Sequence, residues 1–514
     1  MKKQSKNFYI TTPIYYVNDV PHIGHAYTTV ICDTIANFNN WLGKSVNFLT
    51  GTDEHGQKVE KSALKAGIDP QSFTNEVSKS FHNLVEKLEI NNTDFIRTTE
   101  KRHKESVVEL WKKLEKKGDI YLGKYSGWYS IRDEAFYSED EIEQDKNGNK
   151  IAPNGSEVEW LEEPSYFFRL SAWQDKLLKF YKDNPEFISP KSRYNEVLSF
   201  VRKGLEDLSI SRTTFRWGIP VPNNDDHIIY VWLDALTNYI SALNYPNKND
   251  ENWKTFWPAD IHVVGKDILR FHAVYWPAFL MAADIETPIK IYAHGWWTVD
   301  GKKMSKSTGN VVSPDYIINK YGLDQFKYFL LREVRFGQDG DFSENALVKR
   351  VNADLANDYG NLAQRVLSFI YKNNEALIPN KGTLSKVDKD LLNDMAIITD
   401  NIINYMKDYK ITDALEELWI IIRKSNTYID EQAPWALKKT DLDRMNTVLY
   451  VLCSIIKNVS LIAQNFIPIG ANKILDQLLI HKNDREYNNI DDELISGTKI
   501  SKPEGVFPRL EIKE

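Results

Sequence analysis

Hydrophobic positions follow two different periods in the first hundred residues. Residues 8–12 and 46–49 are short segments rich in aromatic, β-branched and other strand-forming residues, bounded by Pro13 and Gly51, and such segments are typical of strands. Between and after these runs, apolar residues recur every three or four positions, which is typical of amphipathic helices. The helical stretches are 24–41, 57–66, 70–88 and 101–117. Strands that alternate with helices predict βαβ units and a parallel sheet.

The pattern changes between about residues 118 and 217. Residues 121–137 are aromatic and interrupted by glycine, which favours strands, and residues 145–155 are polar, which is typical of a hairpin tip. Helical periodicity returns at 172–182 and 192–204. Strands at 228–232, 261–264 and 289–293 and a helix at 266–283 then repeat the opening pattern. We therefore expect one parallel sheet that is interrupted by an inserted module.

Beyond about residue 343 the chain has only helical periodicity. Apolar residues recur at spacings of three and four through 355–371, 391–409, 414–428 and 445–462. The last stretch, 483–514, is polar and has no clear period. These patterns predict an α/β sheet domain that is followed by an all-α bundle.

Composition is that of a globular chain with several domains. The 514 residues suggest three or four domains at about 150 residues each. Hydrophobic residues make up 42% and charged residues 27%, which excludes wholesale disorder. The longest apolar stretch, 273–283, is about half as long as a bilayer span, and the basic start is not followed by the apolar region of a signal peptide. We therefore expect a cytoplasmic protein without a membrane segment.

Two counts limit the cofactors and partners. Cys32 and Cys453 are the only cysteines, so a disulfide scaffold and a zinc site of several thiolates are excluded. The formal net charge is −7, so an RNA partner would have to bind to a local basic surface.

Small, polar or titratable residues follow four of the predicted strands. Because the carboxyl ends of parallel strands lie at one edge of a sheet, these residues are expected to meet in one ligand-binding crevice. Ordinary turns would explain any single segment, but four such segments in one sheet favour a site. The first segment consists of Tyr15, Tyr16 and residues 22–25, and the other three are 51–56, 265–267 and 294–295.

Two short motifs suit phosphate chemistry. His22-Ile23-Gly24-His25 places two imidazoles and free backbone N–H groups at a helix start, where an anion can bind. A metal-binding pair and a pair of capping histidines are the alternatives. The second motif, Lys302–Asn310, has three lysines in its first five positions and can neutralise a polyphosphate during transfer. A solvated lysine run is the alternative for this motif.

Both motifs, nearly three hundred residues apart, make the chain similar to the class I aminoacyl-tRNA synthetases. Four segments (12–18, 51–56, 231–235 and 265–268) narrow the resemblance, which extends from residue 8 to about 470, to the methionyl-tRNA synthetase family. The resemblance implies a Rossmann-type parallel-sheet catalytic domain in two halves, 1–117 and 218–295, which a β-rich connective insert, 118–217, separates. A lysine-loop connection (296–342), a helical anticodon-binding domain (343–482) and a C-terminal tail (483–514) would follow.

The family activates L-methionine with ATP and transfers the methionine to the 3′ end of tRNA(Met). The resemblance implies these substrates here, with Mg²⁺ on the ATP. Asp53 would hold the methionine ammonium through its charge, and an aromatic pocket suits a polarizable thioether. The other implied methionine-binding residues are Ile14, Tyr16, Trp232, Ala235, Tyr239, Ile268 and His272, with Phe271 and Trp276 behind them or simply in the core.

The resemblance also implies a set of ATP-binding residues. His22, His25 and Lys306 would contact the phosphates, and Asp267 would hold the ribose hydroxyls. Gly24 and Gly265 would border the nucleotide. With Lys303 in support, the implied catalytic set is His22, His25, Lys303 and Lys306. Arg212 is a weaker candidate, for which a structural ion pair is an equal alternative.

In the helical domain the resemblance implies that Asn361, Arg365 and Trp435 bind the anticodon. Asn361 and Arg365 lie one helical turn apart. Trp435 follows a proline at a predicted helix start, where its ring can stack on an unpaired base. Helix packing is the alternative for each residue.

Two departures from the family change the expected cofactors and assembly. Ser130 and Asp133 stand where many relatives have a zinc-binding Cys-x-x-Cys pair. Serine is a poor zinc ligand and one aspartate does not complete a site, so no zinc is expected. The chain also stops soon after the bundle, without the appended RNA-binding and dimerisation domain of some relatives, so a monomer is expected.

Two alternative functions are another class I synthetase and a non-catalytic tRNA-binding protein. The leucine, isoleucine and valine enzymes of class I have a far larger editing insertion than the insert 118–217. The cysteine enzyme recognises its substrate with zinc and thiolates, and such ligands are absent from this sequence. A non-catalytic tRNA-binding protein on a synthetase body predicts damaged ATP motifs, whereas both motifs are intact here.

Overall fold

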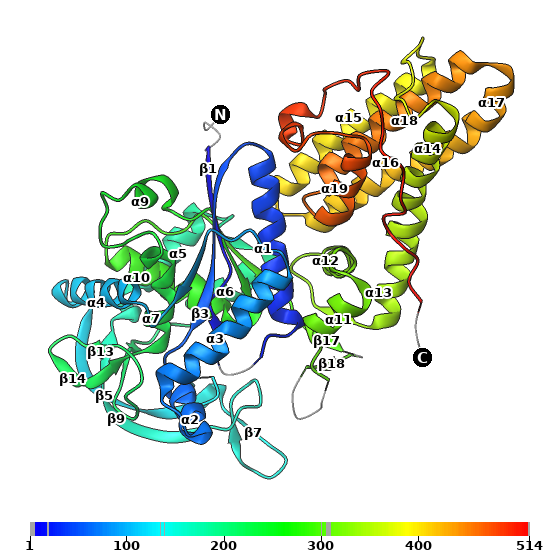
Figure 1. The fold of residues 1–514 in the computed structure, drawn as a ribbon. Helices are drawn as coiled ribbons and strands as arrows, with labels where there is room; N and C mark the ends of the chain where they lie inside the picture. Colours follow the sequence, from blue (N-terminus) through cyan, green and yellow to red (C-terminus); the bar gives the residue numbers. More distant parts are fainter. Residues whose placement is uncertain are drawn as a thin grey trace. The chain divides into compact units, whose positions relative to one another are not determined.

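The computed structural model describes residues 6–17, 20–133, 135–137, 139–299, 301–304 and 310–511. Contacts divide the chain into two compact units. Residues 7–21 and 46–294 form what we call the sheet unit, and residues 1–6, 22–45 and 295–514 form the helical unit (Figure 1). The units divide next to the expected bound at 295, whereas the expected bounds at 117, 217, 342 and 482 do not coincide with a division between units. The domain bounds stay a prediction.

The sheet unit is built on one seven-stranded sheet, whose order is β10-β16-β15-β1-β3-β2 with β4 paired to β3. The bounds are β1 Asn7–Thr11, β2 Tyr15–Tyr16, β3 Ser45–Asp53, β4 Asp94–Arg97, β10 Ile188–Ser189, β15 Ile261–Gly265 and β16 Ile291–His294. The pairs β1–β15, β15–β16, β10–β16, β2–β3 and β3–β4 are parallel. The predicted parallel α/β sheet is therefore confirmed.

Strand β3 runs two residues beyond its predicted end at Gly51. The glycine lies inside the strand because β4 passes very close to it. A Cβ atom at Gly51 would lie 2.0 Å from the carbonyl oxygen of Ile96, so only glycine fits. The extension carries Asp53 to the carboxyl end of the strand.

Helices α2 (Gln57–Ala66), α3 (Pro70–Lys87) and α4 (Lys101–Lys116) lie within one residue of their predicted ranges. Local signals explain this agreement. Gly67, with a φ of +72°, ends α2 in the left-handed conformation. Asp69 then caps α3, because its carboxylate accepts the N–H of Ser72 at 3.0 Å.

Two predicted elements of the sheet unit are wrong in detail. The apolar run 228–232 is not one strand, since β14 (Asn224–Ile229) ends and α7 (Val231–Leu236) begins within it. The predicted helix 266–283 is irregular: it divides into η3 (Lys266–Ile268), a π-helical turn η4 (Phe271–Tyr275) and α10 (Trp276–Ala282). Pro277 has no N–H for the carbonyl of Ala273, which instead accepts the Tyr181 hydroxyl at 2.7 Å.

The predicted insert has its own strands but shares its core with the parallel sheet. Phe168 packs edge-on against Phe279 of α10 at 4.8 Å, and β10 extends the parallel sheet itself. The remaining strands are β5 Ile120–Ser130, β6 Ala135–Tyr137, β7 Glu143–Gln144, β8 Lys150–Ile151, β9 Glu159–Phe168, β11 Leu208–Ser209, β12 Ser211–Arg212 and β13 Pro220–Val221. The helices are η1 Glu139–Glu141, η2 Leu170–Trp173, α5 Gln174–Asp183, α6 Lys191–Arg202, α8 Asn238–Ser241 and α9 Glu251–Phe256.

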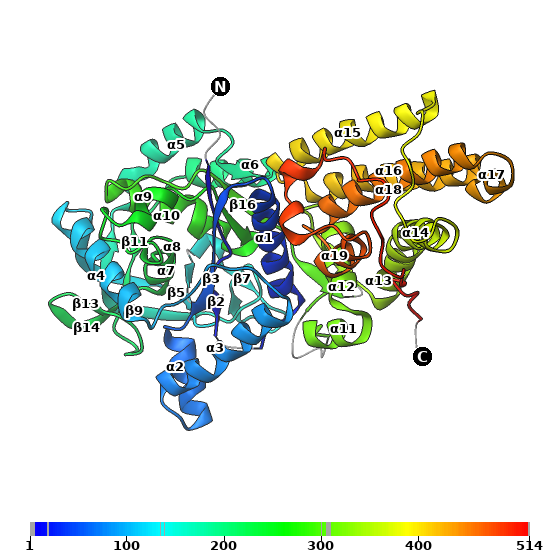
Figure 2. The same cartoon turned by 45° about the horizontal axis from the view of Figure 1, so that its top comes forward.

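In the helical unit the predicted bundle is confirmed, and its long helices α15, α16 and α18 lie side by side (Figure 2). The helices are α1 Ile23–Trp41, α11 Pro314–Tyr321, α12 Leu323–Arg332, α13 Glu344–Val351, the π-helical η6 Asn352–Gly360, α14 Asn361–Asn373, α15 Lys386–Lys407, α16 Ile411–Gln432, α17 Pro434–Thr440, α18 Leu442–Ala463, α19 Pro468–Gln477, η7 Lys482–Asp484 and η8 Tyr487–Asn489. Three short strands, β17 Trp297–Val299, β18 Lys302–Lys303 and β19 Gly340–Phe342, form a small sheet.

Helix α18 is long and apolar enough to cross a membrane by length and composition. In its most apolar window, however, 83% of the helix is buried inside the structure. A buried core helix passes the same composition test, so α18 alone is weak evidence for a membrane span.

Candidate functional site

The carboxyl edge of the parallel sheet gathers the predicted residues of the sheet unit. Tyr16 on β2 lies directly beside Asp53 on β3, and Gly265 on β15 lies beside His294 on β16. Asp53 is 7% exposed. Because these strands are parallel, their carboxyl ends lie at one edge of the sheet, as expected, and the ligand-binding crevice at that edge stays a prediction.

An aromatic wall lies in the same unit. The ring of Trp232 on α7 stacks on Phe271 with centroids 3.7 Å apart and planes 5° apart. His272 meets the edge of the same tryptophan at 6.3 Å. Of the other residues predicted for a methionine pocket, Ile14, Tyr16 and Ile268 are partly buried against the core, Trp276 lies inside it, and Ala235 is buried.

Tyr239 and His272 form a neutral hydrogen-bonded pair. Burial lowers the pKa of His272 to about 4, so its ring carries one proton near neutral pH. Nδ1 lies 2.9 Å from the carbonyl oxygen of Ile268, which can only accept, so the proton is on Nδ1. Nε2 therefore accepts the hydroxyl proton of Tyr239 at 2.7 Å.

Layers behind this pair were not foreseen from the sequence. The ring of His262 stacks on Tyr239 with centroids 4.0 Å apart, and its Nδ1 lies 2.9 Å from the hydroxyl of Thr11. The hydroxyl of Tyr9 donates to the backbone carbonyl of Tyr239 at 2.9 Å. His262 and its neighbours in strand β15 are buried, and because these neighbours are apolar they give no sign of its ring contacts.

A second buried network links segments that are distant in sequence. Both oxygens of Asp234 on α7 are engaged by imidazoles: Nδ1 of His55 lies 2.7 Å from Oδ2, and Nε2 of His103 lies 2.6 Å from Oδ1. These hydrogen bonds and the two rings hold the pKa of Asp234 at about 2 in spite of burial. His103 was not predicted, although a histidine on the apolar face of α4 was a signal for it.

Gly265 and Asp267 form a compact turn after β15. A Cβ atom at Gly265 would lie 2.6 Å from Oδ1 of Asp267, so this position requires glycine while the carboxylate keeps its place.

The weaker candidate Arg212 is buried in the same unit. It is 1% exposed, and its Nη1 donates to the Ser209 hydroxyl at 2.9 Å and the Ser211 carbonyl at 2.7 Å.

In the helical unit, the two histidines of the first motif cap helix α1. Nδ1 of His22 accepts the N–H of Gly24 at 3.0 Å, and the N–H of His22 donates to Nδ1 of His25 at 3.1 Å. Both Nδ1 atoms are therefore acceptors, and a neutral ring then carries its proton on Nε2. Desolvation and the neighbouring His22 lower the pKa of His25 well below its ordinary value, which keeps that ring neutral.

The expected free backbone N–H groups at this helix start are a wrong prediction. The N–H of Ile23 donates to the carbonyl of Val312 at 3.1 Å, the N–H of Gly24 donates to the His22 ring, and the N–H of His25 donates to the carbonyl of His22. The anion-binding hypothesis at this helix therefore depends on the imidazole Nε2–H groups.

The lysine motif is described only in part. Lys303 lies on strand β18, paired with Thr298 of β17. Lys306, with residues 305 and 307–309, lies outside the described residues. The bond from Ile23 to Val312 joins the start of α1 to the segment that follows the motif.

The three predicted anticodon residues belong to two neighbouring helices of the bundle. Nη2 of Arg365 on α14 donates to Oδ1 of Asp430 on α16 at 2.6 Å, and its guanidinium lies 5.5 Å from the ring centroid of Trp435 on α17. Trp435 is 44% exposed and Asn361 is exposed.

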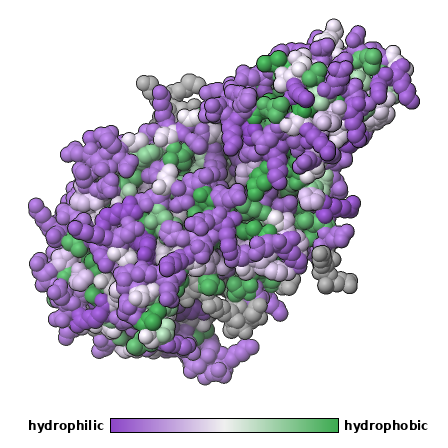
Figure 3. Space-filling model, in the orientation of Figure 1, coloured by the Kyte–Doolittle hydropathy of each residue, from purple (hydrophilic) through white to green (hydrophobic). Residues whose placement is uncertain are grey.

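The surface of the molecule is mostly hydrophilic on the face drawn in Figure 3, where hydrophobic residues form separate patches.

Comparison with known families covers nearly the whole chain. Residues 8–367 match the family described as tRNA synthetases class I (M), and residues 378–514 match the anticodon binding domain of methionyl tRNA ligase. The chain belongs to the methionine family of class I tRNA synthetases.

Individual members of this family are similar over their full length. A methionine--tRNA ligase of Rickettsia felis is 55% identical over 509 residues, which is 98% of each chain. A methionine--tRNA ligase of Brucella suis is 50% identical over 505 residues, again 98% of each. The structure of the Mycobacterium tuberculosis methionyl-tRNA synthetase in complex with methionyl-adenylate is 47% identical, with a TM-score of 0.96 over 98% of this chain and 100% of that one.

The insert of this synthetase has a hydrogen-bonded cluster at the position of the expected cysteine pair. The hydroxyl of Ser130 donates to Oδ2 of Asp133 at 2.9 Å, and the hydroxyl of Tyr137 donates to the same oxygen at 3.1 Å. Within the described ranges no group of three or more His, Cys, Asp or Glu residues could hold a metal ion. The donor set at Ser130 and Asp133 does not fit zinc.

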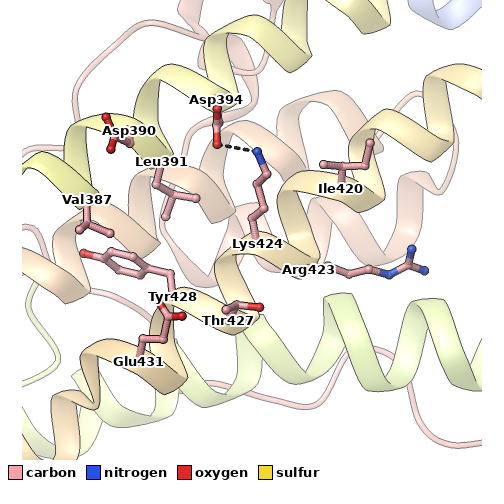
Figure 4. A pocket seen from close by; sticks show the side chains of 10 residues that line it. All are labelled: Val387, Asp390, Leu391, Asp394, Ile420, Arg423, Lys424, Thr427, Tyr428 and Glu431. Carbon is pink, nitrogen blue, oxygen red and sulfur yellow. Dashed lines mark hydrogen bonds and ion pairs between the residues drawn. The ribbon is translucent and has the colours of Figure 1, made fainter.

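One open groove in the helical unit lies apart from the predicted site residues of this synthetase. It has a volume of about 470 Å³ and runs between α15 and α16 (Figure 4). Lys424 points across it to Asp394, with Nζ 2.7 Å from Oδ2. None of the residues predicted to bind methionine, ATP or the anticodon lines this groove.

Proposed function

We propose that this chain is a methionine--tRNA ligase: it activates L-methionine with ATP to methionyl-adenylate and pyrophosphate, then transfers methionine to the 3′ end of tRNA(Met) and releases AMP. One observation in the geometry carries the proposal. The buried carboxylate of Asp53 lies at the sheet edge in a unit whose other candidate groups, Trp232, Phe271 and the Tyr239–His272 pair, are aromatic and neutral. Such a set suits one ammonium group and one apolar thioether.

In this proposal Asp53 binds the methionine ammonium, and Trp232, Tyr239 and His272 surround the side chain with Ile14, Tyr16, Ala235 and Ile268. The methionine carboxylate attacks the α-phosphorus of ATP, a carboxyl–phosphate bond forms, and pyrophosphate leaves with the electrons of the broken P–O bond. No side chain acts as a nucleophile, so the rate comes from positioning and from stabilising the developing charge.

The ATP-binding residues in this proposal are His22, Gly24, His25, Gly265, Asp267 and Lys306, with Lys303 in support. The hydrogen bonds of His22 and His25 support it: each Nδ1 accepts a backbone N–H, so Nε2 is the nitrogen of each ring that carries a proton, and such N–H groups bind phosphate oxygens. Mg²⁺ bound to the ATP neutralises phosphate charge.

An ATP–pyrophosphate exchange assay with a panel of amino acids tests the activation step. Methionine alone should support rapid exchange, and leucine, isoleucine, valine and cysteine should not. Exchange with one of those four amino acids would favour another class I enzyme. No exchange with any amino acid, together with retained tRNA binding, would favour a non-catalytic tRNA-binding protein.

We further propose that Asn361, Arg365 and Trp435 contact the anticodon, that the chain is a cytoplasmic monomer, and that it has no zinc. The close approach of Arg365 to the exposed ring of Trp435 supports the proposed anticodon contacts.

The Ser130–Asp133–Tyr137 cluster supports the proposed absence of zinc, because its hydrogen bonds replace a metal as the cross-link of that turn. Metal analysis of the purified protein should find no stoichiometric zinc, and gel filtration with light scattering should give one chain mass.

A further inference from the structure

The His55–Asp234–His103 network connects the two parts of the sheet unit that face methionine in the proposed function. His55 lies two residues after Asp53, the proposed ammonium ligand, and Asp234 lies two residues after Trp232, the proposed wall of the pocket. One hydrogen bond of 2.7 Å between His55 and Asp234 therefore joins the end of β3 to helix α7.

We propose that His103 is a positioning residue for methionine: acting through Asp234, it sets the spacing between the Asp53 carboxylate and the Trp232 ring. This inference rests on the proposed function.

The charge of Asp234 makes each of its bonds necessary. Asp234, His55 and His103 are at most 2% exposed, so water does not replace a lost partner. Each carboxylate oxygen is met by one imidazole nitrogen, and because a carboxylate only accepts, Nδ1 of His55 and Nε2 of His103 must both donate. Without the Nε2–H of His103, Oδ1 would be a buried charged atom without a donor, which is strongly unfavourable.

Loss of the His103 donor is expected to move the pocket wall, because Asp234 and Trp232 lie on the same short helix. Helix α7 has six residues, so a shift that brings Asp234 to a new donor also moves Trp232. Helix α4 has sixteen residues, with His103, Val107 and Leu110 buried along one face, and so provides the rigid side. The hydroxyl of Ser241 on α8, 2.9 Å from Nδ1 of His103, holds the ring from its other side.

The opposite end of the link is also held firmly. The ring of His55 meets the edge of Trp217 at 5.5 Å, and the indole N–H of Trp217 donates to the carbonyl of Glu54 at 2.6 Å. The N–H of Gly56 donates to the carbonyl of Trp217 at 3.0 Å. Since residues 54–56 are fixed in this way, a change at His103 is expected to displace α7 and not Asp53.

A pair of matched substitutions separates positioning from packing. In His103→Gln the side-chain amide nitrogen takes the place of Nε2 and can still donate to Asp234. In His103→Asn it takes the place of Nδ1, on the side of Ser241, and cannot. Both residues are neutral and polar and differ by one methylene, so a role limited to packing predicts losses of stability without a selective rise in the methionine KM.

The measurements are the KM for methionine and for ATP in pyrophosphate exchange, with the Kd for methionine from calorimetry. We expect His103→Asn to raise the methionine KM and Kd about tenfold, which is about 1.4 kcal/mol, with the ATP KM within about twofold. His103→Gln should stay within about twofold for both substrates. Equal methionine KM values for the two variants, or parallel losses for both substrates, would overturn the inference.

A control and a second pair complete the design. Ser106 lies on α4, as His103 does, and its buried hydroxyl donates to the carbonyl of Tyr245. Ser106→Ala should lower stability without raising the methionine KM.

If neither His103 variant folds, His55→Asn keeps a donor at the Nδ1 position and His55→Gln does not. His55→Gln alone should then raise the methionine KM, and equal effects would contradict the inference. Wild-type protein that fails to exchange with methionine would instead contradict the proposed function.

Discussion

The hydroxyl of Tyr239 donates to Nε2 of His272 across 2.7 Å, while Nδ1 of the same ring donates to the carbonyl of Ile268. Both ring nitrogens of a fully buried histidine are thus committed to the neutral form. The pair gives the pocket wall a fixed hydrogen-bond direction. The neutral His272 ring is also expected to lower the free energy of unfolding at acid pH.

Acid destabilisation is the first prediction. Burial lowers the pKa of His272 to about 4, against about 6.5 in an unfolded chain. Above pH 6.5 neither state binds the proton. Below it only the unfolded state does, so the free energy of unfolding falls as the pH decreases from 6.5 to 4, by about 3 kcal/mol in all.

His272→Gln isolates this effect, because glutamine does not titrate and its oxygen can accept from Tyr239. Urea denaturation at pH 7, 6 and 5 should show a smaller loss of stability for the variant than for the wild type. The buried His25, whose pKa is also lowered, adds to the loss in both proteins equally. Parallel curves would show that His272 does not titrate as expected.

Gly24→Ala should disturb the cap of α1. The new Cβ atom would lie 2.8 Å from Cε1 and 3.0 Å from Nδ1 of His22, so the ring must leave its position. Loss of a cap costs about 1 kcal/mol, and the Nε2–H of His22 would turn away from its proposed phosphate. We expect slightly lower stability and at least tenfold slower pyrophosphate exchange. Wild-type exchange would mean that the His22 ring does not act on ATP.

The buried ion pair between Asp33 on α1 and Lys327 on α12 predicts a strong single-variant effect. Nζ lies 3.3 Å from Oδ2, and the side chains are only 2% and 4% exposed. Lys327→Met removes the buried ammonium from this carboxylate and should cost about 3–5 kcal/mol. The double variant with Asp33→Leu should recover most of that loss. A double variant as unstable as the single one would show that shape, and not charge, holds this contact.

Lys306→Ala should lower pyrophosphate exchange by at least a hundredfold without a change in thermal stability. The lysine motif is expected to neutralise charge that develops in the transition state, and such an interaction affects the rate more than the fold. Lys302→Ala, in the same run, is the matched control and should retain most of the activity. Near-normal exchange in the Lys306 variant would remove this residue from the catalytic set.

Trp435→Ala should separate the two steps of the reaction. Base stacking on an aromatic ring is worth about 1–3 kcal/mol, so the KM for tRNA(Met) should rise about tenfold or more while methionine activation is unchanged. Trp160→Ala removes a similarly exposed tryptophan, at 51%, from the insert and serves as control. If activation and charging fall together in the Trp435 variant, the residue is structural.

Local chemistry in the sequence was sufficient for most of the elements and for the motifs. Helix α2 was predicted at both ends because its period is regular and Gly67 stops it. The first motif was placed at a helix start, and α1 begins there with His22 as its cap. The family motifs themselves are contiguous, so no folding was needed to read them.

Contacts between distant segments were beyond the reach of the sequence. Trp232 was assigned to a strand because an apolar run that is buried on all sides has no period to distinguish strand from helix. His103 meets Asp234, 131 residues away, only because α4 and α7 pack together. The sequence by itself determined which residues could do the chemistry, since composition and spacing are local. The tertiary structure decided which of them are held, and in which protonation state, because burial and pairing arise only when the chain folds.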